Sequence, residues 1–129
     1  LGDWMRRENL VPDQVLCSSA QRTRDTLAEL NLDDANVQYL DALYHAGPDR
    51  MAGVLAKATG RMILMIGHNP GIAEFAGMLV RETPEHMRFW DYPTGSTLVV
   101  EFAEDSWTKA ATGRGKCTHF VTPRDLPDA

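Results

Sequence analysis

Two short segments carry the side chains best suited to chemistry, and both would suit a phosphoryl group. Residues 17–24 read Cys-Ser-Ser-Ala-Gln-Arg-Thr-Arg and contain Arg22. Residues 67–71 read Gly-His-Asn-Pro-Gly and contain His68 and Asn69. A guanidinium presents a planar fork of donors that matches phosphate oxygens, and an imidazole can donate a further hydrogen bond. If the two segments meet in space, they form an anion site.

Each segment is expected to connect a buried strand to a helix. Residues 14–18 form a short apolar run, and residues 61–66 (Arg-Met-Ile-Leu-Met-Ile) resemble the strands of parallel sheets that are covered on both faces. Ser19 is expected to cap the first helix, and the second helix is expected over residues 72–80. Helix N-termini attract anions, and ligands bind beyond the carboxyl ends of parallel strands. Neighbouring strands would therefore bring both segments to one crevice.

The rest of the chain fits the same α/β pattern. An opening helix is expected to run to about residue 9. Another helix, between the two segments, is expected to begin at Pro48 and end at Gly60. Further strands are expected over residues 37–40, 97–102 and 117–121, with a polar turn between the last two. Strands alternating with helices predict a three-layer α/β/α sandwich with a mainly parallel central sheet, formed by residues 1–129 as a single domain.

Composition narrows the class of protein. The chain has 129 residues and a formal net charge of -5, which argues against binding to nucleic-acid backbones. It has no apolar stretch long enough for a membrane span and no secretion signal, so a cytoplasmic location is expected, with Cys17 and Cys117 as reduced thiols. No cluster with the spacing of metal ligands occurs. We therefore expect no metal and no cofactor.

Three segments together resemble the histidine phosphatase superfamily, also called phosphoglycerate mutase-like, and in particular its short SixA-type branch of phosphohistidine phosphatases. They are residues 17–27, residues 67–71 and the run Pro-Thr-Gly-Ser-Thr-Leu-Val-Val-Glu-Phe at residues 93–102. The resemblance implies that a histidine in an Arg-His motif near the N-terminus attacks phosphorus and becomes phosphorylated.

The resemblance also assigns roles to residues of this chain. Arg22 matches the second arginine around the phosphoryl oxygens, and His68 matches the second histidine. The backbone amide of Asn69 would face the phosphate. Phosphate would thus be held by Arg22, His68 and Asn69.

Two features depart from the family pattern. No Arg-His motif occurs in the 129 residues, and the helix at Leu1 has no preceding cap, so the first strand and the nucleophile are expected upstream, and this chain alone is expected to be inactive. The glutamate that serves many relatives as proton donor has no counterpart. Asp41 and His45 are the candidates, although His45, like His86 and His119, is otherwise interpreted as an ordinary surface or core histidine.

The sequence therefore predicts a metal-independent phosphatase that acts through a covalent phosphohistidine. Its short length leaves little chain for a capping insertion, which favours phosphohistidine in a protein as substrate. Two alternatives stay open: a phosphatase of small phosphomonoesters, and a noncatalytic module that binds phosphate or a phosphorylated partner. Neither nucleic acid nor a membrane is expected as a partner.

Overall fold

A three-stranded parallel sheet in the order β2–β1–β3 has at its centre a strand, β1, whose five residues are all buried. The computed structural model describes residues 1–32 and 34–126. The strands of this sheet are β1 (Gln14–Ser18), β2 (Asn36–Leu40) and β3 (Ile63–Ile66), while β4 (Thr97–Glu101) and β5 (Lys116–Val121) form a separate antiparallel pair. The helices are α1 (Gly2–Arg7), α2 (Gln21–Leu30), α3 (Pro48–Ala56), α4 (Gly71–Leu79) and α5 (Trp107–Ala110), with single 3₁₀ turns η1 (Asp41–Leu43) and η2 (Pro123–Asp125).

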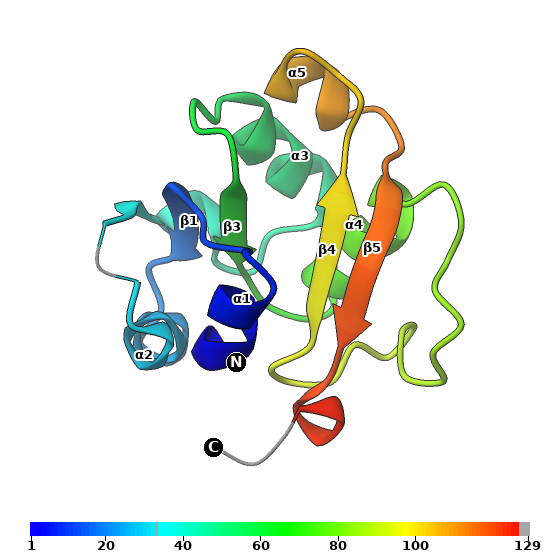
Figure 1. Ribbon diagram of the computed structural model, residues 1–129. Coiled ribbons are helices and arrows are strands. Elements are labelled where there is room, and N and C mark those ends of the chain that lie inside the picture. Colours follow the sequence, from blue (N-terminus) through cyan, green and yellow to red (C-terminus); the bar gives the residue numbers. More distant parts are fainter. Residues whose placement is uncertain (33, 127–129) are drawn as a thin grey trace.

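Successive side chains of β1 enter two different apolar clusters, because neighbouring residues of a strand point to opposite faces of its sheet. Val15 and Cys17 pack with residues of α1 and α2, whereas Leu16 packs with residues of α3, α4 and η1. All three are at most 2% exposed. Helices therefore cover both faces of β1, which is the central strand of its sheet (Figure 1).

The antiparallel pair β4–β5 has a core of its own. Ala76 in α4 and Val80 directly after it pack with Phe89, Tyr92 and side chains of both strands. Because α4 also contributes Phe75 to the cluster on β1, this helix connects the two sheets. The position of α4 thus fixes how the loop before it, residues 67–70, faces the rest of the protein.

A buried amide fastens the start of β1 to the turn before β3. Gln14 is 4% exposed; its Oε1 accepts hydrogen bonds from the amides of Thr59 and Gly60, both at 2.9 Å, and its Nε2 donates to Gln38 Oε1 at 2.8 Å. Asp13 beside it accepts from the next two amides, at residues 61 and 62. These backbone hydrogen bonds lower the pKa of the Asp13 carboxyl.

The parallel strands and the α/β class predicted from the sequence are confirmed, with several corrections. α3 ends at Ala56 instead of Gly60, because the amides of Thr59 and Gly60 bond to Gln14. The strand predicted from Arg61 begins at Ile63, because Asp13 takes the two preceding amides. The opening helix ends at Arg7, and α5 occupies part of the predicted polar turn.

The prediction that Ser19 caps α2 is wrong. Ala20 is the N-cap residue, and the Ser19 hydroxyl instead donates a hydrogen bond to the carboxylate of Asp41 in η1. Ser19 lies one residue before the N-cap position, and its hydroxyl makes a charge-assisted hydrogen bond to Asp41 instead.

Three further expectations concern layering, membranes and thiols. The three-layer sandwich stays a prediction, because the strands lie in two separate sheets. Within the described ranges, no helix is long and apolar enough to cross a membrane. Cys17 and Cys117 are free thiols, and burial raises the pKa of each.

We predict that Gln14→Met lowers the free energy of unfolding by about 1–3 kcal/mol, because the partly buried amides of Thr59 and Gly60 lose the acceptor that they share. Urea denaturation measures this loss. Gln38→Met is the matched control: Gln38 is exposed, so water can replace its bond to Gln14, and the loss should be smaller. Equal losses in the two variants would contradict the role given to the Gln14 carbonyl.

Candidate active site

The carboxyl ends of β1 and β3 lie side by side and open into one crevice. The two strands pair in parallel, with Cys17 opposite Ile66, so the chain leaves both strands at the same edge of the sheet (Figure 1). From β1 the chain enters α2 and from β3 it enters α4. The two segments singled out in the sequence therefore meet, as was predicted.

A hydrogen bond between Ser18 and His68 joins the two segments. The distance from His68 Nε2 to Ser18 Oγ is 2.7 Å, and Ser18 is completely buried. Ser18 Oγ also accepts the amide of Ala20 at 3.3 Å, which leaves the hydroxyl proton available to His68 Nε2. In that arrangement the other ring nitrogen of a neutral His68 carries the ring proton. Ser18 thus orients the imidazole.

The environment of His68 favours the uncharged ring. Burial lowers the pKa of His68, and the positive charges of Arg22 and of a protonated His45 lower it further. A histidine whose pKa lies below 6.5 is mostly neutral at pH 7. His68 is therefore suited to donate a hydrogen bond without adding a second positive charge to the crevice.

Arg22 lies in the first turn of α2 and is exposed toward the same cleft as His68 and Asn69. The turn is anchored by Thr23, whose hydroxyl donates to the carbonyls of Ser18 and Ala20, both at 2.8 Å. In the described part of the chain, no hydrogen bond or ion pair engages the Arg22 guanidinium. Its fork of donors is therefore available to an anion.

The side chain of Arg24, two residues further along the chain, contacts other parts of the protein. Its Nε donates to the carbonyl of Ser19 at 2.9 Å, and its guanidinium carbon lies 4.1 Å from the centroid of the Tyr39 ring. Such a cation over an aromatic face is held by the ring quadrupole. Arg24 therefore supports the loop, and Arg22 is the arginine of the site.

The side chain of Asn69 fastens the second segment to a distant loop. Its Nδ2 donates to the carbonyl of Tyr92 at 2.8 Å, and Tyr92 is 8% exposed with a φ of 44°. The buried ring and this hydrogen bond hold residues 67–71 from the side opposite β1. That the Asn69 amide faces a bound phosphate stays a prediction.

Tyr44 was not assigned to the site from the sequence, whereas His45 was named as a candidate proton donor. The ring of Tyr44 meets His68 edge-on with centroids 5.5 Å apart, and His45 lies 6.4 Å from His68 between centroids. Ser18 was also missed as a partner of His68. Its position as the last residue of a buried strand, one residue beyond the Cys17–Ile66 pair, is the signal that points to it.

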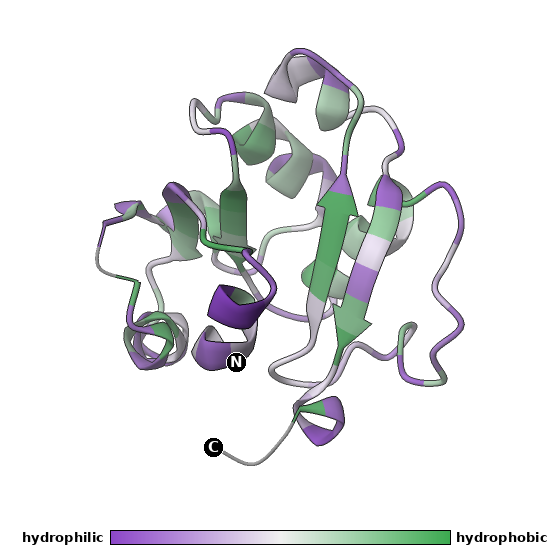
Figure 2. Cartoon of the chain, viewed as in Figure 1, coloured by the Kyte–Doolittle hydropathy of each residue, from purple (hydrophilic) through white to green (hydrophobic). Residues whose placement is uncertain are grey.

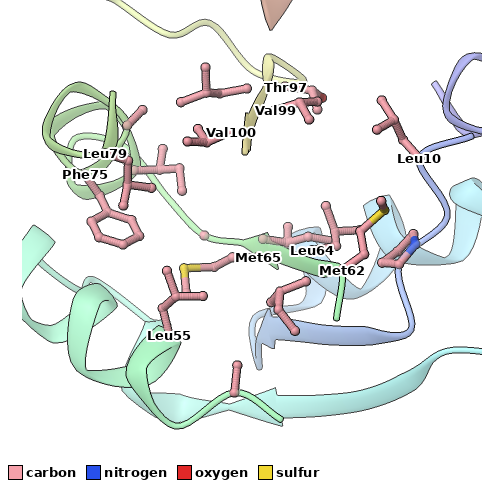
Figure 3. A pocket seen from close by; sticks show the side chains of 18 of the residues that line it. Leu10, Leu55, Met62, Leu64, Met65, Phe75, Leu79, Thr97, Val99 and Val100 are labelled. Atoms are coloured by element: carbon pink, nitrogen blue, oxygen red, sulfur yellow. The ribbon is translucent and has the colours of Figure 1, made fainter. Parts of the chain in front are cut away.

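A large apolar cleft of about 1270 Å³ extends from the crevice between the two sheets. Figure 3 shows Leu64 and Met65 of β3 on one side of it and Val99 and Val100 of β4 on the other. β3 is hydrophobic along its length, and β4 is hydrophobic over its three middle residues, between Thr97 and Glu101 (Figure 2). All four residues of β3 are only half-buried, although the sequence predicted a fully covered strand, because one edge of β3 borders the cleft.

The donor groups for a metal are not gathered in one place. Among residues 1–32 and 34–126, no three or more His, Cys, Asp or Glu side chains form a group that could hold a metal ion. The positive charge in the crevice comes instead from side chains such as Arg22.

Comparison with known proteins gives relatives over nearly the whole chain. The protein ML1117 of Mycobacterium leprae, which is uncharacterised, is 32% identical over 129 residues, covering 95% of this chain and 79% of the relative. The uncharacterised protein Rv1276c of Mycobacterium tuberculosis is 28% identical over 130 residues, covering 95% and 81%. No family model matches the chain.

Solved structures share the fold. A structure from Nakamurella multipartitia named as a phosphohistidine phosphatase SixA matches with a TM-score of 0.83 and 28% identity, over 95% of this chain and 77% of that one. The protein histidine phosphatase SixA complexed with tungstate matches with a TM-score of 0.73 and 18% identity, over 98% and 78% of the two chains. At 18% identity, the match to the tungstate-bound structure shows only that the two proteins share a fold.

We predict that the pKa of His68 lies below 6.5 and rises in Arg22→Gln, because that variant removes one of the positive charges that lower it. NMR titration of the imidazole resonances measures both values. The pKa stays below 6.5 even in the variant, since burial, the larger cause, is unchanged. Arg81→Gln, at the far end of α4, is the matched control and should leave the titration unchanged. An Arg22→Gln curve that coincides with the wild-type curve would show that the guanidinium does not act on His68.

Proposed function

This chain belongs to the same protein family as ML1117 of Mycobacterium leprae and has the fold of the SixA-type histidine phosphatases, and we propose that it removes phosphoryl groups from phosphohistidine in proteins. The observation that carries the proposal is the meeting of His68 and Arg22 at the joint end of β1 and β3. A neutral donor and a guanidinium with no partner among the described residues together suit an anion with several oxygens. Tungstate, which the SixA structure contains, is a tetrahedral oxyanion of that kind.

Arg22 and His68 act on the charge of the transition state. During phosphoryl transfer the negative charge spreads over the three equatorial oxygens, and donors that are already in place stabilise it without rearranging. Arg22 supplies a double donor, and the N–H of neutral His68 supplies a further one. Ser18 keeps the His68 ring in the donating orientation through the 2.7 Å bond to its Nε2.

The nucleophile is proposed to be a histidine of an Arg-His motif on a segment that precedes Leu1. Its support is the cleft between β3 and β4, which is long, apolar and bordered by the edge of a strand. An extended segment lying there parallel to β3 would bring its C-terminal end to His68, as β1 and β3 do with theirs. Apolar side chains of such a strand would cover Leu64 and Val99, whose exposure to water is unfavourable.

The reaction then has two steps. The nucleophilic imidazole forms a bond to phosphorus while the phosphorus–nitrogen bond of the substrate breaks, and the electron pair stays on the substrate ring. That ring leaves without charge if its other nitrogen is protonated. In the second step water attacks the phosphorus, and the bond from phosphorus to the enzyme imidazole breaks with its electron pair returning to that ring. The proton lost by the water passes to solvent, and inorganic phosphate is released.

The test is hydrolysis of a phosphohistidine peptide by the complete protein. We predict that His68→Ala lowers kcat about 100- to 1000-fold, the range seen when one preorganised donor is removed. Arg22→Ala should weaken vanadate binding about 10- to 100-fold, as expected for a charge-assisted hydrogen bond. Arg81→Ala, an exposed arginine at the other end of α4, is the matched control for both.

The outcomes separate the alternatives. Turnover that His68→Ala removes supports the phosphatase, and faster turnover of sugar phosphates than of the peptide would replace phosphohistidine by a small phosphomonoester as substrate. A complete protein that binds vanadate through Arg22 but hydrolyses neither substrate would be a phosphate-binding module, and the proposal would fail.

We also predict that the activity persists in EDTA at millimolar concentration, because Arg22 and His68 supply the donors that a metal would otherwise provide. The measurement is the initial rate on the phosphohistidine peptide before and after exhaustive dialysis against the chelator. A rate that is lost and then restored by one divalent cation would refute the metal-independent mechanism.

A further inference from the structure

Two tyrosines and an arginine form an exposed surface beside the crevice, which we call the β2 rim. It consists of Arg24 in the first turn of α2, Tyr39 near the end of β2 and Tyr44 directly after η1. Tyr39 is 45% and Tyr44 is 48% exposed, and Arg24 is exposed as well. Tyrosine and arginine are enriched where proteins contact other proteins. The β2 rim therefore has the composition of a contact surface.

Arg24 supplies the charge of the β2 rim. Its Nε donates to the carbonyl of Ser19, and its guanidinium carbon lies over the ring of Tyr39. Among residues 1–32 and 34–126, no hydrogen bond or ion pair engages the two terminal nitrogens of this guanidinium. The carboxylate of Asp41 accepts the Ser19 hydroxyl instead. The terminal N–H groups of Arg24 are therefore available to a carboxylate, whose two oxygens match their planar fork.

Local hydrogen bonds hold the β2 rim in place. The amide of Tyr44 donates to the carbonyl of Asp41 at 2.9 Å, and Leu43 between them is 1% exposed. Ser19 accepts from Arg24 with its carbonyl and donates to Asp41 with its hydroxyl. A surface that is already ordered loses little conformational entropy when a partner binds.

The β2 rim adjoins the crevice but lies outside the cleft. The ring of Tyr44 meets the ring of His68 edge-on, with centroids 5.5 Å apart, and Arg24 is two residues from Arg22. Arg24, Tyr39 and Tyr44 lie outside the set of described residues that line the cleft together with Arg22 and His68. A substrate must therefore extend beyond its phosphoryl group to touch the β2 rim, which small phosphorylated molecules do not do.

The charge beside the crevice is opposite to that of the chain as a whole. The formal net charge is -5, so most of the surface repels an acidic ligand. The first turn of α2, in contrast, contains Arg22 and Arg24 and no acidic residue. Acidic side chains of a substrate are therefore stabilised most when they lie next to the bound phosphoryl group.

We propose that the β2 rim is a docking surface for the protein that carries the phosphohistidine, and that it binds acidic side chains flanking the phosphohistidine. The proposal rests on the phosphatase function proposed above and specifies the partner. Carboxylates of the partner pair with the terminal nitrogens of Arg24, while apolar parts of its side chains cover the rings of Tyr39 and Tyr44. These contacts act on binding of the partner and not on the bond to phosphorus.

The experiment compares two synthetic peptides as substrates of the complete protein. Both carry one phosphohistidine and have the same length, but the flanking residues are aspartate and glutamate in one peptide and serine and glycine in the other. We expect kcat/KM to be about 5-fold higher for the acidic peptide, mainly through a lower KM, which is the upper contribution of an exposed ion pair. Sodium chloride should reduce this preference, because salt screens exposed charges.

Two variants test the residues of the β2 rim. In Arg24→Gln the preference for the acidic peptide should fall below about 2-fold, and Tyr39→Leu, which removes the aromatic face under the guanidinium, should reduce it part of the way. A disturbance of the loop changes both rates together and cancels in their ratio, so the ratio reports docking. Arg81→Gln, which removes the charge of an exposed arginine beyond the C-terminal end of α4, is the matched control and should keep the wild-type preference.

The outcomes separate the docking surface from the phosphatase function. Equal kcat/KM for the two peptides in the wild-type protein, or a preference that Arg24→Gln retains, would overturn the docking surface and leave the phosphatase function intact. An equal fall of the preference in Arg81→Gln would also overturn it, because net charge would then be the cause. A wild-type protein that hydrolyses neither peptide contradicts the phosphatase function itself.

Discussion

The parallel pairing of β1 with β3 is the constraint on which the site depends. The register that sets Cys17 opposite Ile66 makes both strands end at one edge, and the first polar side chains beyond that pair are Ser18 and His68. Their 2.7 Å hydrogen bond joins residues 50 positions apart in the chain. Because α2 and α4 begin directly after these residues, the same register also places Arg22 and the Asn69 loop.

A gradient of exposure across the crevice decides which groups are charged. Ser18 is fully buried, His68 is half-buried, and Arg22 and His45 are exposed. Desolvation penalises a charge most at the buried end, which lowers the pKa of His68, while the Arg22 guanidinium lies toward the solvent and keeps its hydration.

The elements around the crevice could be predicted from local patterns, and the contacts between them could not. Continuous apolar runs predicted β1 and β3, and the glycine and proline around His68 predicted the turn into α4. The Ser18–His68 bond and the buried amide of Gln14 join residues about 50 positions apart, which no local pattern encodes. Ser19 has the residue type of a helix cap, but α2 begins one residue later, with Ala20 at the N-cap position. α5 has only four residues, too few for a helical periodicity to be visible.

The open edge of β3 also bears on the solubility of the molecule. A strand edge with unpaired backbone groups, flanked by apolar side chains such as Leu64 and Met65, is a template for strands of other molecules. Copies of the chain whose cleft is unfilled can pair edge to edge, and such association grows with concentration and leads to aggregates. A strand that paired with this edge would therefore also lower the tendency of the protein to aggregate.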